Sequence, residues 1–454
     1  MPRVKRPIEV RRRMKGITTP RRLASLPEPA PTLREQSGII LIGVFAGGLA
    51  VAFHAVINLA EFVRADLAFL ADSHSLLAET GIVLACAGLA TASVALVRLL
   101  APEAEGSGIA AVLEAHRTTV GPLRALRILW VKFVAGFLGL ASGMPLGREG
   151  PSVQIGTMAA VILRRYGPRL VYFRRRSMHL GAAAGLAAAF NAPLSGAVFS
   201  FELLRQPFSN RNGFETLLVC AVADWICRLF HGPVLELPID LHGFRELREL
   251  PTFVLVGVWA GGVAIIFQWL VLAAARWFGS RAQGHAAALA ITAAWGGLLG
   301  VVLLEWPDLL GIGHPLFESA IDGTLPLAIA GMALIARLPL TAFSYATGAP
   351  GGLIVPALLF GVLAGHLFSG GYELVAGEVE PDFHAVCLVA GMAASIGALF
   401  RTPLTATILA VEITGSYACL LEIVIAYVAS HAMLGLAGQP DLYTALGRVH
   451  ARKS

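Results

Sequence analysis

Residues 143–156 have the sequence GMPLGREGPSVQIG, and residues 348–361 have the sequence GAPGGLIVPALLFG. At an offset of 205 residues, two prolines and three glycines of the two stretches coincide. Both stretches interrupt apolar sequence, and glycine–proline breaks of this kind end membrane helices inside the bilayer. Paired breaks in the two halves of a chain therefore predict a transport site where the halves meet.

The composition indicates a membrane protein with several spans. Hydrophobic residues make up 56% of the chain and charged residues only 14%, whereas soluble domains carry about 25% charged residues. The net charge of +6 reflects basic residues that crowd into the first 35 positions, ahead of an apolar run that starts near Gly38. This pattern predicts an uncleaved, cytoplasmic N-terminus and no nucleic-acid partner. A solvated basic tail without a further role explains the same residues.

Apolar spans separated by short polar breaks fill most of the chain. Several spans are shorter than the ~20 residues that cross a bilayer, which predicts tilted and partly re-entrant helices buried in protein. The longest polar interruption lies near the centre and is interpreted as a linker. The expected parts are a basic N-terminal segment (1–36), a transport domain (37–446) made of repeat one (about 37–230), the linker (231–250) and repeat two (about 251–437), and a short C-terminal tail (447–454).

Two further matches support a duplication. Residues 181–203 align with residues 391–413 at an offset of 210, and the identities include Glu202 with Glu412. Lys132 and Arg337 each precede the first glycine of their motif by 11 residues. Equal halves joined by one linker are typical of inverted-repeat transporters, although sequence alone leaves a parallel arrangement open. The predicted fold class is an all-α polytopic membrane protein with two inverted-topology repeats of tilted, partly re-entrant helices.

The motif chemistry favours an anion site. Pro151 is suited to the first turn of a helix, and the neighbouring glycines leave backbone N–H groups accessible. The start of a helix carries partial positive charge and binds anions. Residues 106–109 form a third break, in which two glycines flank a hydroxyl. A helix kink explains any one break alone, but breaks in symmetric positions favour binding. The candidate anion-binding residues are Gly106, Ser107, Gly108, Gly147, Arg148, Gly150, Leu353 and Ile354.

Glu149 is a candidate gate and proton carrier. Its counterpart in the second repeat is Ile354, so the duplication does not require a carboxylate there. A charged carboxylate among anion-binding N–H groups competes with the anion, and a protonated one withdraws. The alternative is a carboxylate that stabilises a helix start. Lys132 and Arg337 are interpreted either as electrostatic support for anions or as buried cations paired with backbone carbonyls.

Taken together, these motifs resemble the CLC chloride channel and transporter family. The three breaks match its signature loops in order and spacing, and residues 440–443 (PDLY) resemble the segment with its pore tyrosine. The resemblance covers roughly residues 37–446. It implies a homodimer and a protein of the prokaryotic type, without CBS domains. It also implies a multi-pass protein of the inner cell membrane whose two termini are cytoplasmic. It also implies that the hydroxyls of Ser107 and Tyr443, with the backbone N–H groups of Leu353 and Ile354, bind chloride.

One departure from the family pattern bears on function. Proton-coupled members often carry a glutamate, the internal proton acceptor, at the position of Leu203. The expected function is Cl⁻/H⁺ exchange with Glu149 as external gate, and the alternative is a passive chloride channel. An intramembrane enzyme is a remote alternative, since the chain has no HExxH motif and no histidine spaced to serve Ser142 or Ser195. No enzymatic activity, metal or cofactor is expected besides bound chloride ions; the expected partners are chloride, protons, the lipid bilayer and a second copy.

Overall fold

The structure, a computed structural model, describes residues 31–71, 75–114, 121–166, 174–232, 235, 237–239, 241, 250–377, 382–438 and 440–451. Within these residues the chain forms helices joined by loops, with one isolated antiparallel bridge. Seven of the described helices are long and apolar enough to cross a membrane. The predicted all-α polytopic membrane fold is therefore confirmed.

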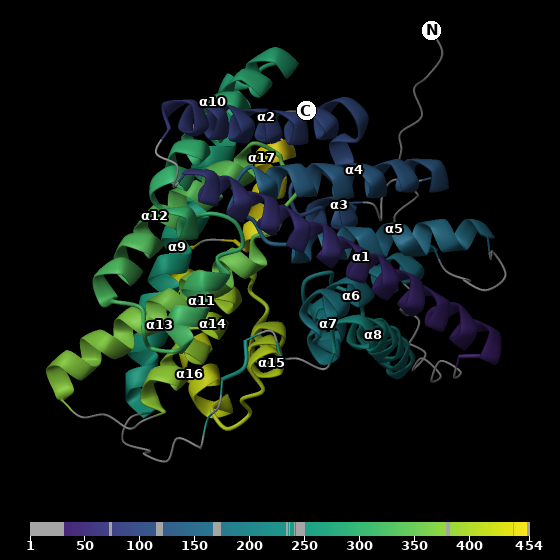
Figure 1. Cartoon of the computed structure of the whole chain (residues 1–454). Helices are drawn as coiled ribbons and strands as arrows, with labels where there is room; N and C mark the ends of the chain where they lie inside the picture. Colours follow the sequence, from purple (N-terminus) through teal and green to yellow (C-terminus); the bar gives the residue numbers. More distant parts are fainter. Residues whose placement is uncertain are drawn as a thin grey trace, which may run out of the picture.

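The helices form two successive series, and corresponding helices follow one another in the same order in each. In Figure 1 most helices of the first series lie on the right and most helices of the second series lie on the left. The first series is α1 (Leu33–Ala71), α2 (Leu76–Leu100), η1 (Pro102–Ala104), α3 (Ile109–Glu114), α4 (Pro122–Ala141), α5 (Glu149–Tyr166), α6 (Arg174–Phe190), α7 (Pro193–Glu202) and α8 (Asn210–His231). The second is α9 (Leu250–Arg281), α10 (His285–Glu305), η3 (Pro307–Leu309), α11 (His314–Ile321), α12 (Leu327–Ala346), α13 (Ile354–Ala376), α14 (Phe383–Phe400), α15 (Pro403–Thr414) and α16 (Leu420–Leu436). The short helix α17 (Leu442–Ala451) follows.

Two helix ends differ from the expected boundaries. Helix α1 begins at Leu33, inside the segment assigned to a basic N-terminus. Thr32 and Glu35 form a capping box at this start, and Glu35 also bonds to Arg211 of another helix, α8. Helix α17 continues to Ala451, so it includes most of the expected tail. Residues 1–30 and 452–454 lie outside the described residues.

The expected linker falls between α8 and α9. Only some of its residues are described, and two of them, Leu237 and Ile239, donate backbone N–H groups to the carbonyls of Ile413 and Thr414 at 3.0 and 3.1 Å. Residues 237–239 of the linker therefore lie along the end of α15 in the second repeat.

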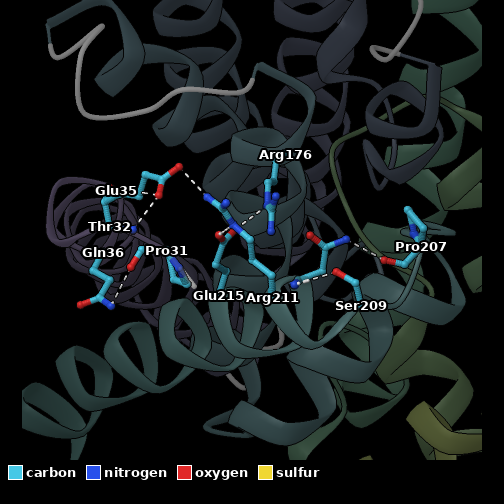
Figure 2. A network of polar contacts seen from close by, with 10 residues as sticks. Pro31, Thr32, Glu35, Gln36, Arg176, Pro207, Ser209, Arg211 and Glu215 are labelled. Atoms are coloured by element: carbon cyan, nitrogen blue, oxygen red, sulfur yellow. Dashed lines mark hydrogen bonds and ion pairs between the residues drawn. The ribbon is translucent and has the colours of Figure 1, made fainter. Parts of the chain in front are cut away.

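The start of α1 is fixed by ion pairs, which Figure 2 shows. Arg211 of α8 bonds to Glu35 of α1 and, at 2.9 Å, to the buried Glu215 on its own helix. Arg176 of α6 forms an ion pair with the same Glu215. Helices α1, α6 and α8 are therefore tied together at one end of the first repeat.

Glycines set the closest helix packing in both repeats. A Cβ added to Gly156 of α5 would overlap the carbonyl oxygen of Gly181 in α6, and one added to Gly361 of α13 would overlap that of Gly391 in α14. Small residues let membrane helices approach until their backbones touch. The glycines that the two repeats share in sequence thus fix the same α5–α6 and α13–α14 packing.

Each repeat caps a helix of the other. The carboxylate of Glu412, in α15, accepts from the N–H groups of Leu194 and Ser195 at 2.9 and 2.7 Å. In the reverse direction, Glu202 of α7 accepts from the N–H groups at the start of α15, those of Leu404 and Thr405, also at 2.9 and 2.7 Å. Carboxylates at helix starts satisfy free N–H groups and the helix dipole. Glu202 therefore has a structural role.

Replacing either cap by glutamine tests this reciprocity. Glu202→Gln and Glu412→Gln should each lower the free energy of unfolding by roughly 1–2 kcal/mol, because each removes a charged cap. Thermal unfolding of the detergent-purified protein measures the change. Glu373→Gln, at the exposed end of α13, is the matched control and should leave the midpoint unchanged. A loss in only one of the two cap variants would contradict the equivalence of the repeats.

Candidate functional site

The two motif loops cross each other at the centre of the protein. The N–H of Gly147 donates to the carbonyl of Gly352 at 2.9 Å, and the N–H of Gly352 donates back to Gly147 at 2.7 Å. This antiparallel bridge lies directly before the starts of α5, at Glu149, and α13, at Ile354. A reciprocal antiparallel pair is what a two-fold axis through the crossing produces, and it brings two helix N-termini together.

Two more loops pack onto this crossing. The N–H of Gly106 reaches the carbonyl of Gly348 at 3.5 Å, and Gly351 donates to the carbonyl of Gly106 at 3.1 Å. The equivalent bond at the same offset runs from Gly311 to the carbonyl of Gly143 at 3.3 Å. The loop at 311–313 is thus the counterpart of the loop at 106–108, with positive φ at both glycines of each. The sequence analysis missed it, because only the Gly-x-Gly spacing is shared.

The buried cations hold these loops. Lys132 Nζ donates to the carbonyls of Ala104 and Gly106 at 2.9 and 2.7 Å. Arg337 donates to the carbonyls of Gly311 and Ile312 at 2.8 and 3.2 Å. Both side chains are fully buried. Of the two interpretations open from sequence, pairing with backbone carbonyls is the one the structure displays. Electrostatic support for an anion stays a prediction.

Ser107 lies at the junction of the loops. Its side chain is 1% exposed, and its Oγ accepts from the N–H of Ile109 at 3.3 Å. A Cβ added to Gly150 would come 2.6 Å from the Cβ of Ser107 and 3.1 Å from the Cα of Gly352. The absence of a side chain at Gly150 is therefore what lets the starts of α5 and α13 meet the serine.

Tyr443 reaches the same junction from α17. Its ring stacks on Phe400 of α14 with 5.2 Å between ring centroids, and the residue is only 2% exposed. Its hydroxyl lies near the side chain of Ser107. Predicted site residues from both repeats and from the C-terminal helix are thus brought together.

Glu149 is buried beside the crossing, with 1% of the residue exposed. Its Oε1 lies 3.8 Å from Arg148 Nε, and its Oε2 lies against Gly147. The side chain of Arg148 extends to His54 of α1, with 2.8 Å between Nη1 and Nε2. Since arginine only donates, His54 Nε2 accepts, and its imidazole is neutral. His54 was not predicted; a polar residue within an apolar span was the available signal.

Comparison with known proteins identifies the family of this fold and site. A sequence profile for the family described as "Voltage gated chloride channel" matches residues 88–435. The chain belongs to this family.

A relative found by sequence and two solved structures agree with that membership. The H(+)/Cl(-) exchange transporter ClcA of Vibrio vulnificus (strain YJ016) is 31% identical over 412 residues, which cover 89% of this chain and 87% of that protein. The solved structure of a slow cyanobacterial Cl-/H+ antiporter is 26% identical with a TM-score of 0.84, covering 92% of this chain and 98% of that one. A CLC-type fluoride/proton antiporter shares the fold, with 18% identity, a TM-score of 0.73, and coverage of 90% and 96%.

The position expected to hold an internal proton acceptor is apolar in this chain. Leu203, where the resemblance gave an internal proton acceptor, is 7% exposed and follows the last residue of α7. The carboxylate of the neighbouring Glu202 accepts hydrogen bonds from N–H groups at the start of α15. The neighbouring polar pair is Ser200 and Gln206, with 2.7 Å between Oγ and Oε1. Among the described residues, no group of three His, Cys, Asp or Glu side chains is placed to hold a metal ion.

A methyl group at Gly150 should disturb the junction. Gly150→Ala would place its Cβ against Ser107, and overpacking of this kind costs roughly 1–3 kcal/mol. Thermal unfolding of the purified variant should show a lower midpoint. Gly262→Ala is the control, because open space surrounds that position of α9, and it should stabilise by up to about 1 kcal/mol. A Gly150→Ala protein as stable as the unaltered one would show that Gly150 does not pack on Ser107.

Proposed function

We propose that this chain exchanges chloride for protons across a membrane, with Glu149 as gate and proton carrier. The observation that carries the proposal is the junction itself. The Ser107 and Tyr443 hydroxyls and the start of α13 converge beside a buried carboxylate. Relatives named as Cl⁻/H⁺ exchangers align over most of the chain.

The proposed anion ligands are neutral donors. The N–H groups of Leu353 and Ile354 begin α13, and the first N–H groups of a helix have no partner within it. With the two hydroxyls they replace the water shell of an anion, and the helix dipole favours negative charge there. Because none of these donors is a full cation, the anion is held without being trapped. Gly106, Gly108, Gly147 and Gly150 allow the close approach, and Lys132 and Arg337 add positive potential.

Glu149 links the anion to the proton. Its carboxylate lies against the loop crossing, beside Gly147. When charged, the carboxylate competes with an anion for the same hydrogen-bond donors. When protonated, it is no longer attracted to these donors and can move away from the site. Anion entry and protonation of Glu149 therefore favour each other, which is the condition for coupled exchange. Arg148, bonded to His54, keeps a cation beside the carboxylate.

The inner proton step distinguishes exchange from a passive channel. Leu203 offers no carboxylate, and a buried apolar side chain there favours the channel alternative. We propose that water passing Leu203 supplies protons in its place. The chain acts as a homodimer in an inner cell membrane with both termini cytoplasmic, binds chloride ions without another cofactor, and has no enzymatic activity. These assignments rest on the family resemblance and on the basic residues before α1.

Reconstitution tests the exchange directly. In proteoliposomes with an imposed chloride gradient, no initial pH difference and the voltage held at zero, chloride leaving down its gradient should drive protons uphill. Simultaneous chloride and pH electrodes record both fluxes. Chloride movement without proton movement, at rates far above transporter turnover, would support the channel instead.

Glu149→Gln should separate the two fluxes in that assay. A neutral side chain neither competes with chloride nor carries a proton, so chloride flux should persist without pH dependence while proton movement is lost. Glu373→Gln, with the same charge change far along α13, should keep both fluxes. Full proton movement in Glu149→Gln would exclude Glu149 as the carrier.

A further inference from the structure

A third hydroxyl lies at the proposed anion site. Tyr345, in the last turn of α12, places its Oη 3.5 Å from Ser107 Oγ. Its ring lies over Gly106, where an added Cβ would come 3.1 Å from the Tyr345 Oη and 3.2 Å from its Cζ. The ring and the Gly106–Ser107 loop are therefore fitted to each other, and Gly106 leaves the room that the ring uses.

Hydrogen bonds at the end of α12 hold Tyr345 in place. The carbonyl of Tyr345 accepts from the N–H of Gly348 at 3.2 Å, so the tyrosine and the second motif loop share one helix end. The preceding residue, Ser344, accepts from Trp295 Nε1 at 3.0 Å. Tyr345 thus reaches Ser107 from the same repeat that supplies the N–H groups of Leu353 and Ile354.

The three hydroxyls have unused hydrogen-bonding capacity. Hydroxyl hydrogen bonds are normally about 2.5–3.0 Å long, so the Tyr345–Ser107 contact is a weak one. Within the described part of the chain, the Tyr443 hydroxyl has no hydrogen-bond partner of normal geometry. Buried polar groups rarely remain without a partner. Ser107 is the neighbour that the two tyrosine hydroxyls share. One acceptor shared among the three oxygens would satisfy all of them.

We propose that Tyr345 is a direct ligand of the transported anion and strengthens the preference for chloride over larger anions. This inference rests on the proposed chloride site. A hydrogen bond to a charged partner is stronger than one between neutral groups. The attraction between an O–H dipole and an anion also weakens with distance, so an added hydroxyl favours a small ion over a large, diffuse one such as thiocyanate. The equivalent position in the first repeat is Leu140, which has no donor to offer.

Tyr345→Phe tests the role of the hydroxyl, because phenylalanine keeps the ring that packs on Gly106. Calorimetric titration of the purified protein with potassium chloride and with potassium thiocyanate gives the two affinities. Loss of one charge-assisted hydrogen bond should weaken chloride binding about tenfold. Thiocyanate binding should weaken by less than about threefold, since the larger ion gains less from the hydroxyl.

Tyr372→Phe is the matched control, because Tyr372 lies in α13 with its ring 5.0 Å from Phe383 and away from the loops. It should leave both affinities within about twofold of the unaltered protein. Unchanged chloride affinity in Tyr345→Phe would overturn the inference. So would an equal weakening of both anions, which would indicate a loosened site. If the unaltered protein bound no chloride, the proposed function itself would fail.

Discussion

Two reciprocal hydrogen bonds between the backbones of Gly147 and Gly352 are the constraint on which the rest of the structure depends. A helix broken inside a membrane exposes N–H and carbonyl groups that lipid cannot satisfy. Here each broken loop satisfies the other, and a Cβ on Gly352 would come 2.8 Å from the backbone nitrogen of Gly150, so glycine is needed there for the start of α5 to pack on the loop. The crossing then fixes the starts of α5 and α13 against each other. The positive ends of both helices are consequently brought together, and we propose that an anion binds there.

The same exchange between repeats recurs away from the centre, in the mutual capping by Glu202 and Glu412. The two-fold relation between the repeats accounts for the helix scaffold, whereas the polar residues of the junction occur in only one of the two repeats. The polar residues at the junction have apolar counterparts at the 205-residue offset, namely Ile312 for Ser107, Ile354 for Glu149 and Leu140 for Tyr345. One polar junction has therefore been built from a duplicated scaffold. We propose that the buried carboxylate of Glu149 gives the junction a response to protons.

The paired motifs were sufficient to predict the fold class and most of the junction. Gly-Pro breaks and a buried charge at equal spacing are local signals, and each has a direct physical cause. Contacts between distant segments left no such signal. Tyr345 is one residue of an apolar helix, and its relation to Ser107 depends on how α12 ends. The bond from His54 to Arg148 likewise joins helices far apart in sequence. The start of α1 at Leu33 had a local signal, the capping box of Thr32 and Glu35, but the ion pair of Glu35 with Arg211 of α8 joins distant segments.

Anomalous diffraction from crystals soaked in bromide tests most directly whether the paired loops form the anion site. Bromide scatters anomalously and resembles chloride in charge and size, so its position marks the site without a functional assay. The account predicts a peak within hydrogen-bonding reach of the Ser107 and Tyr443 hydroxyls and the N–H groups of Leu353 and Ile354. Bromide bound only at the outer surface, with ordered water alone between these donors, would contradict it.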